Sequence, residues 1–456
     1  MTNKELTAQF SDALTAGIVR RWYPLVIDKE CGGYFTNVNY DWTLPPEQEK
    51  MIVTQARHVW TLSKLASFLE AKEKYEGMAM HGYGFLKNHM WDAEFGGFYQ
   101  IRNRIGGMSD ARMWRDEKRA YGCAFAIYGL AALAHQTGDP EVLEFAKQGF
   151  HWIEEHSFDP KAGGYFEFLT REGKAFDRNS SYKTNAADAN ELGFKDQNSS
   201  IHLLEAYTEL YNVWKSPEVR TQLEGLLRLI RDTMVAKEGY LRLFFNPDWT
   251  PVSFRDATEE KRKANFGLDH VSFGHDYETA FLMLEASHAL GIENDVATLS
   301  TAKNMLDHAL RYGFDESAGG FYDGGYYLKG ETECTVVLSS KNWWAQAEGL
   351  NALLLFSKIF PGEKKYEEYF LKQWNYVKTY IIDPENGDWF EGGIDKEPHF
   401  KTGPKSHIWK CTYHTGRALM NCIDLLEERK SSSREKEILH LVEWWKKVAR
   451  SEPHRD

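Results

Sequence analysis

Helical patterns of apolar and polar residues cover most of the chain. In residues 53–72 and again in 75–91, apolar residues recur at positions i, i+3, i+4 and i+7, the spacing that gives a helix one buried face. The same pattern predicts further helices near 4–22, 118–137, 140–156, 197–214, 217–235, 272–291, 296–313, 339–359, 364–382 and 412–427. These twelve predicted helices form six consecutive pairs.

A short glycine–aromatic signal recurs six times, and its second residue is 33, 97, 164, 239, 320 or 388. Glycine permits a tight turn, and aromatic flanks favour short hairpins. A signal that returns every 64 to 81 residues indicates a repeat architecture. Six helical hairpins that close on themselves predict an all-α fold, an (α/α)6 barrel with alternating inner and outer helices. An open superhelix of helix pairs is the alternative.

The barrel is predicted to span residues 1–428 as one catalytic domain. Residues 429–456 contain one more amphipathic stretch, which we expect to form an extra C-terminal helix and tail packed outside the barrel. Two links, 171–197 and 244–271, are long for a compact domain, and long links are more often functional than idle.

Composition narrows the class of protein. The chain has 42% hydrophobic and 27% charged residues, and its net charge of −12 argues against nucleic acid or an anionic membrane as a partner. Five scattered cysteines form no C-x-x-C motif, so neither a disulfide framework nor a zinc knuckle is indicated. Without an apolar leader or a membrane-length run, we expect a reduced, cytoplasmic protein, either a monomer or a homodimer.

The even-numbered helices begin with polar and aromatic residues where an ordinary core would have Leu and Ala. Because the glycine signals always join an odd helix to the next even one, these first turns are expected to share one end of the barrel. We interpret them as an active site. In chain order the residues are Arg57, Trp60, Lys118, Tyr121, Asn198, His202, His275, Glu278, Lys341, Trp343, Trp344, Glu348, Trp409 and His414.

The residue types suggest acid–base chemistry. His275 and His414 belong to different helices and can remove a proton from one face of a substrate carbon and return it to the other. Arg57, permanently charged, can stabilise the enediolate oxygen that develops. Glu278 and Glu348 can orient or tune the imidazoles, while Trp344 and Trp409 offer flat faces for a sugar ring.

Other chemistries have weaker support. The histidines lack a short ligand spacing such as H-E-x-x-H, so no metal is expected. No G-x-S-x-G elbow of a serine hydrolase is present in the sequence.

Six ordered motifs make the chain resemble the N-acylglucosamine 2-epimerase superfamily, and within it the cellobiose 2-epimerase branch, from about residue 10 to 428. The motifs are Gln55-Ala-Arg57-His-Val-Trp60, Lys118-Arg-Ala-Tyr121, Asn198-Ser-Ser-Ile-His202, Ser272-Phe-Gly-His275-Asp-Tyr-Glu278, Lys341-Asn-Trp-Trp344-Ala-Gln-Ala-Glu348 and Trp409-Lys-Cys-Thr-Tyr-His414.

The resemblance implies an (α/α)6 barrel that epimerises C2 of a reducing-end aldose through a cis-enediolate, without a cofactor. His275 and His414 would be the general acid/base pair, and Arg57 would contact the enediolate. The residues that would hold and tune the sugar are Tyr121, Asp188, Asn198, His202, Glu278, Trp344, Glu348 and Trp409. Asp188 lies two residues further upstream than the family pattern leads us to expect.

Four departures from the family pattern bear on the substrate. Ser200, Phe281, Thr412 and Thr415 stand where the family usually has His, Trp, Pro and Asn. We interpret these changes as favouring a monosaccharide, with D-mannose and D-glucose interconverted, as in the mannose 2-epimerase subgroup. The alternatives are a cellobiose 2-epimerase, a mannose–fructose isomerase that moves the proton to C1, a glycoside hydrolase, and a sugar-binding protein without turnover.

Overall fold

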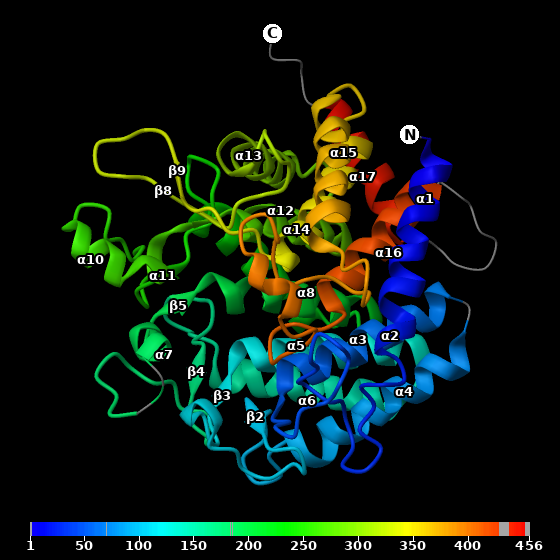
Figure 1. The fold of residues 1–456 in the computed structure, drawn as a ribbon. Coiled ribbons are helices and arrows are strands. Elements are labelled where there is room, and N and C mark those ends of the chain that lie inside the picture. The colour runs from blue at the N-terminus through cyan, green and yellow to red at the C-terminus, as the bar shows by residue number, and fades with distance from the viewer. Residues whose placement is uncertain (1, 70, 183, 185, 428–436, 452–456) are drawn as a thin grey trace.

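The computed structural model describes residues 2–69, 71–182, 184, 186–427 and 437–451. Six inner helices form a closed ring within this part of the chain, since each packs against the next and the last packs against the first (Figure 1). Both faces of an inner helix contact other helices, so nearly all of its side chains are buried, as in residues 52–63. The inner helices are α3 (Ile52–Phe68), α5 (Ala120–Thr137), α8 (Gln197–Val213), α12 (Phe273–Leu290), α14 (Trp343–Ile359) and α16 (Tyr413–Glu427).

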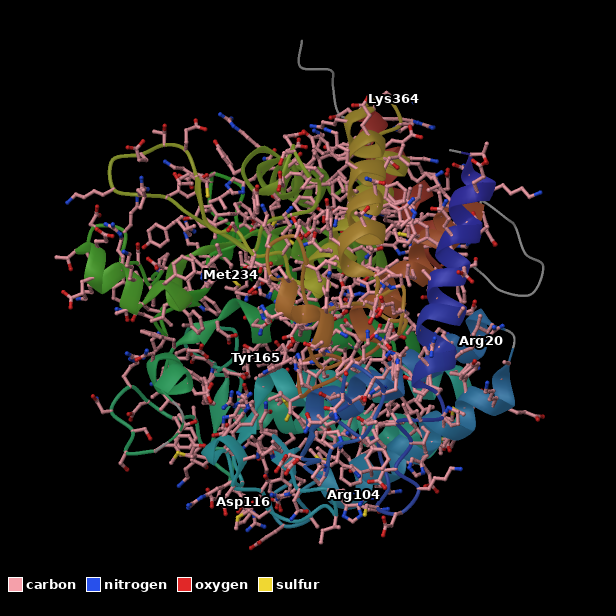
Figure 2. All side chains as sticks on the ribbon, in the orientation of Figure 1. Arg20, Arg104, Asp116, Tyr165, Met234 and Lys364 are labelled. Atoms are coloured by element: carbon pink, nitrogen blue, oxygen red, sulfur yellow. The ribbon has the colours of Figure 1, made fainter. Side chains whose placement is uncertain are left out.

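The outer helices alternate with the inner ones along the chain and bury one face each. In α6 the buried positions include Val142, Phe145, Ala146 and Gly149, the spacing of one helical stripe. The outer helices are α1 (Asn3–Asp12), α4 (Lys72–Phe85), α6 (Pro140–His156), α9 (Pro217–Leu229), α13 (Val296–Gly313) and α15 (Lys365–Tyr376). Side chains cover the whole ribbon, and of the labelled residues Tyr165 and Met234 are buried (Figure 2).

The predicted all-α (α/α)6 barrel is therefore confirmed, with local differences at helix ends. The helix predicted over 4–22 forms without a break, since α1 continues through wider π-helical turns at Ala13–Val19 into the short α2 (Arg20–Trp22). The long links hold short helices of their own, α7 (Ala186–Glu191), α10 (Glu259–Ala264) and α11 (Phe266–Asp269). In the described part of the chain, no helix has the length and apolar character needed to cross a membrane.

Short antiparallel strands lie at one end of the barrel. Among the residues that the structure describes, three two-stranded sheets and one three-stranded sheet join the segment before an inner helix to the next link. The strands are β1 (Lys50–Met51), β2 (Ile101–Arg102), β3 (Lys118–Arg119), β4 (Phe168–Leu169), β5 (Lys195–Asp196), β6 (Phe244–Phe245), β7 (Val271–Ser272), β8 (Gly324–Tyr326) and β9 (Thr335–Leu338).

The C-terminal helix α17 (Glu437–Ser451) packs outside the ring against α12, α13, α14 and α16. Its Trp445 is fully buried, and the indole Nε1 donates to the carbonyl oxygen of Leu284 at 3.2 Å. The proposed domain boundary after residue 428 falls outside the described residues.

A buried ion pair recurs at five of the six glycine signals. Each time, a lysine that precedes an inner helix donates to an aspartate at the start of the glycine turn and to the carbonyl oxygen of the turn's first glycine. Lys195 Nζ, for example, lies 2.7 Å from Asp159 Oδ2 and 2.8 Å from the Gly163 oxygen. The five Lys–Asp pairs are Lys50–Asp28, Lys118–Asp92, Lys195–Asp159, Lys341–Asp315 and Lys405–Asp383.

The turn itself requires glycine. Gly163 and Gly164 have φ angles of 74° and 71°, a region that side chains rarely adopt. A Cβ on Gly164 would also lie only 2.2 Å from the Trp249 ring. Each Lys–Asp pair therefore fixes a turn that is itself rigid, and through it the start of the neighbouring inner helix.

The fourth signal replaces the ion pair with an apolar pair. Ala236 occupies the aspartate position, because Val235 makes the bridge that precedes the aspartate in the other repeats. Val271 occupies the lysine position, two residues before α12. Both residues are buried, with 3% and 1% of their surface exposed. The fourth repeat thus shows that the barrel can form when the lysine and the aspartate are both replaced by apolar residues.

We expect Asp159→Ala to destabilise the fold by about 3–5 kcal/mol, because it leaves the Lys195 ammonium buried without a counter-charge. The double variant Asp159→Ala/Lys195→Val, which copies the fourth repeat, should recover most of that loss. Urea unfolding of the two variants and the wild type measures the difference. A double variant no more stable than the single one would contradict this account.

Candidate active site

A cavity of about 300 Å³ opens at the barrel end where the inner helices begin. Nine of the eleven residues predicted for the site line it. Its wall consists of Arg57, Tyr121, Asn198, His202, His275, Glu278, Asn342, Trp343, Trp344, Glu391, His407, Trp409 and His414. The six first turns thus meet at one place, as their shared position in the repeat requires.

Two predicted residues lie outside this wall. Glu348 lies behind His414 and bonds its ring, as described below. Asp188 accepts hydrogen bonds from Trp114 Nε1 at 2.6 Å and from Arg119 at 3.0 Å. The Trp114 ring in turn lies 6.4 Å from the Trp409 ring, so these side chains connect Asp188 to the cavity wall.

Three residues expected at the mouth lie elsewhere. Lys118 and Lys341 point into the glycine turns and form the ion pairs described above. Trp60 stacks on Tyr128 and lines a second cavity of about 490 Å³, formed near the opposite ends of the inner helices. A helix start alone does not say which way each side chain points.

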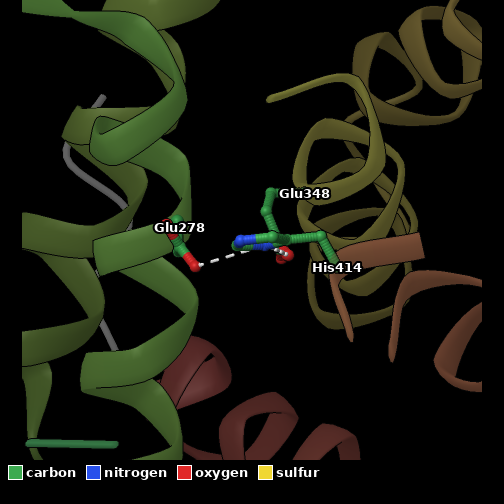
Figure 3. Close-up of side chains that lie close together, drawn as sticks. All are labelled: Glu278, Glu348 and His414. Atoms are coloured by element: carbon green, nitrogen blue, oxygen red, sulfur yellow. Dashed lines mark hydrogen bonds and ion pairs between the residues drawn. The ribbon is translucent and has the colours of Figure 1, made fainter. Parts of the chain in front are cut away.

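His414 is held by a carboxylate beneath it. Its Nδ1 lies 2.8 Å from Glu348 Oε1 and 3.9 Å from Glu278 Oε1 (Figure 3). The Glu348 carboxylate, which also pairs with Arg417, is placed to accept the Nδ1 proton, and in that tautomer the other ring nitrogen, Nε2, is the basic atom. Burial, with the charges of Arg57 and Arg417, lowers the pKa of His414 well below its usual value. The ring is therefore neutral and able to accept a proton.

His275 has a different partner from the one its sequence suggests. Its Nδ1 lies 2.7 Å from the hydroxyl of Ser272, while Glu278, one turn along the same helix, turns toward His414 and Arg417. Burial, with the nearby His202 and His270, lowers the pKa of His275 to about 3. The Trp344 ring packs against both histidines, 4.7 Å from His275 and 5.8 Å from His414.

Arg57 is fixed on the side of the cavity formed by α3. It donates to the Tyr121 hydroxyl at 2.9 Å and to the Trp409 carbonyl oxygen at 3.0 Å, and its guanidinium lies over the Phe125 ring. Its Nε is buried and has no hydrogen-bond partner among the described residues. The group keeps its charge and can stabilise a negative charge on an oxygen bound in the cavity.

Arg417 is the central residue that the sequence analysis missed. Its Nη2 lies 2.8 Å from both Glu278 Oε1 and Glu348 Oε1, and its Nη1 donates to Glu205. Glu205 accepts the Nδ1 proton of His202 at 2.9 Å. One guanidinium thus joins three buried carboxylates on three inner helices. The available signal was its position three residues after His414, which puts both on one helix face.

Burial raises the pKa of both Glu278 and Glu348, and the charge of Arg417 acts against this rise. The oxygens of these two carboxylates and a nitrogen of His414 lie within 4.8 Å of one another, close enough for a cation. Arg417 already lies between the two carboxylates and balances their charge. The arrangement therefore does not fit a metal ion as well as it fits the guanidinium.

The chain belongs to the N-acylglucosamine 2-epimerase (GlcNAc 2-epimerase) family, whose profile matches residues 33–418. It is similar to the cellobiose 2-epimerase of Bacteroides fragilis, with 31% identity over 93% of this chain and 99% of that protein. A D-mannose isomerase of Thermobifida fusca is 25% identical over 74% of this chain and 77% of that protein. The protein is therefore an enzyme of the carbohydrate isomerase class.

The fold comparison agrees. The solved structure of cellobiose 2-epimerase from Bacillus thermoamylovorans superposes with a TM-score of 0.79 at 25% identity, covering 92% of this chain and 99% of that one.

We expect Arg417→Met to lower kcat about 100-fold with a smaller change in KM, because His414 loses its ionised partner. Arg417 lowers the pKa of both His414 and Glu348, so its removal raises both. We expect activity to need neutral His414 over ionised Glu348, so the acid limb of the pH–rate profile should move to higher pH. Arg417→Lys, which keeps a charge, should restore part of the rate. An unshifted profile with only a lower melting temperature would contradict this role.

Proposed function

We propose that the protein epimerises C2 of a reducing-end aldose by removing and returning a proton through a cis-enediolate, without a cofactor. The observation that supports this most directly is the pair His275 and His414, two buried imidazoles of lowered pKa that face one cavity from α12 and α16. A neutral imidazole has an unprotonated ring nitrogen that can accept a proton, as a general base must.

One histidine would take the C2 proton while the electron pair moves to the aldehyde oxygen and forms the enediolate. The negative charge on that oxygen would be stabilised by Arg57. After rotation about the C2–C3 bond, the other histidine would return a proton to the opposite face of C2. The imidazole that returns the proton must itself be protonated, so one of the two histidines would gain a proton when the sugar is bound, and the two exchange roles when the reaction runs in reverse.

The four departures that favoured a monosaccharide do not line the cavity. Ser200, Phe281, Thr412 and Thr415 are each at most 1% exposed, and none of them belongs to the cavity wall among the described residues. They give no reason to exclude a second sugar unit. The similarity to cellobiose 2-epimerases spans almost the full length of both chains. We therefore propose a β-1,4-linked disaccharide such as cellobiose as the substrate.

Interconversion of D-mannose and D-glucose is the second candidate, supported by the similarity to D-mannose isomerase. A mannose–fructose isomerase would use the same enediolate and return the proton to C1. A glycoside hydrolase would need two carboxylates across the scissile bond. Here Glu278 and Glu348 both pair with Arg417, so neither carboxylate is free to act on a glycosidic bond. This supports acid–base catalysis by the histidines over hydrolysis.

The test is incubation with cellobiose and, separately, with mannose in D2O with a chelator, followed by NMR. We expect the C2 epimer of the sugar to form with deuterium at C2. His275→Asn and His414→Asn should each lower the rate about 10²–10⁴-fold, the usual contribution of a general acid or base.

The products separate the candidates. Faster turnover of mannose than cellobiose would favour the monosaccharide, and fructose as main product would favour the isomerase. Unchanged rates in both histidine variants would overturn the proposed mechanism.

A further inference from the structure

The helix that carries His275 begins beside an apolar pair instead of an ion pair. At the fourth glycine signal, Val271 and Ala236 stand where the other repeats have the buried lysine and aspartate. An apolar contact has no preferred direction, so this pair fills space without fixing the rotation of the first turn of α12. The orientation of that turn, in which His275 is the third residue, therefore depends on other contacts.

The fourth residue of α3, α12 and α14 bonds the backbone of the adjacent glycine signal. In α3 and α14 this residue is a glutamine. Gln346, for example, accepts from the backbone N–H of Phe321 and donates to its carbonyl oxygen, both at 2.9 Å. In α12 the residue is Asp276, whose Oδ1 accepts from the backbone N–H of Leu241 at 2.8 Å. A carboxylate cannot donate, so its second oxygen is left to another partner.

That partner comes from the next outer helix. In the α14 repeat, Gln373 of α15 donates to Gln346 Oε1 at 3.0 Å. In the α12 repeat, Asp276 Oδ2 lies 3.5 Å from Nδ1 of His308 on α13. His308 Nε2 lies in turn 2.8 Å from the Tyr327 hydroxyl, which follows β8. Three side chains thus connect the first turn of α12 through α13 to the β8–β9 hairpin.

The contact between Asp276 and His308 also balances a buried charge. Both residues are buried, and neither Asp276 Oδ2 nor His308 Nδ1 makes a hydrogen bond with a described residue. No lysine or arginine among the described residues forms an ion pair with Asp276. Burial raises the pKa of Asp276 to about 6, and His308 acts against this rise. Because a buried carboxylate without a partner is costly, the position of Asp276 depends on His308.

We propose that Asp276 and His308 are positioning residues for His275. Asp276 follows His275 directly in the chain, so the contact with α13 sets the rotation of the turn that carries the imidazole. His308 also packs against Phe273, the first residue of α12, with ring centres 6.2 Å apart. This inference rests on the proposed epimerase function, and it adds two residues that lie outside the cavity wall.

The first test is kinetic and uses whichever sugar is epimerised in D2O. We expect His308→Leu, which leaves Asp276 without a partner, to lower kcat about 10- to 100-fold and to change KM by no more than about twofold. The sugar still binds in this variant, while the His275 ring is displaced. The double variant Asp276→Gln/His308→Gln reproduces the amide pair of α14 and should recover most of kcat.

The second test needs no turnover. In NMR spectra of protein labelled in its histidine rings, the Cε1–H signal of His275 is assigned by its loss in His275→Asn. This signal should shift in His308→Leu and return in the double variant. Tyr327→Phe, which removes only the last hydroxyl of the chain, should shift it less and in the same direction, and it tests the proposal even if His308→Leu does not fold.

Ser287→Ala is the matched control. Ser287 belongs to the far end of α12, and its buried hydroxyl donates to Asp295 Oδ2 at 2.7 Å. This variant should lower the melting temperature and leave both kcat and the His275 signal unchanged. If His308→Leu and Tyr327→Phe also changed only the melting temperature, the positioning role would be overturned. A shifted His275 signal in a protein that epimerises no sugar would support the positioning role and count only against the epimerase proposal.

Discussion

The contact between a buried lysine ammonium, an aspartate and a glycine carbonyl is the constraint on which the rest of this structure depends. It occurs where a glycine turn meets the segment that starts an inner helix. A charge buried so completely has few alternatives to this geometry, because any other position leaves it unpaired. The barrel can therefore hold the first turns of its inner helices in register, and those turns carry the active-site residues.

The second organising element is the charged network at the centre of the ring. Arg417 bonds carboxylates on α8, α12 and α14, and two of these carboxylates bond the imidazoles of His202 and His414. Such a network costs desolvation energy and is a weak source of stability. Its value lies in orientation, since the imidazole Nε2 atoms are left to face the cavity. The site is thus built from long-range contacts among helices that are far apart in sequence.

The sequence predicts the fold well because helical periodicity and a repeated turn signal are local properties. It also predicts which helix ends meet, and nine of the eleven proposed site residues lie in one cavity wall. It does not predict side-chain direction, so Lys118 was expected at the mouth and instead forms an ion pair. It also misses Arg417 and the outer position of Asp188, since these depend on partners 69 or more residues away. The roles of the site residues stay predictions.

The apolar pair at the fourth repeat has a consequence for how such a sequence can change over time. In the other repeats, replacing the aspartate alone would leave a lysine ammonium buried without a counter-charge. Replacing the lysine alone would leave a buried carboxylate unpaired, so either single substitution would destabilise the fold. Yet Ala236 and Val271 show that the barrel accepts the exchange when both positions change. The lysine and the aspartate of a repeat are therefore expected to change together. We expect sequences descended from this barrel to keep both residues of a pair or to lose both, and few of them to keep only one.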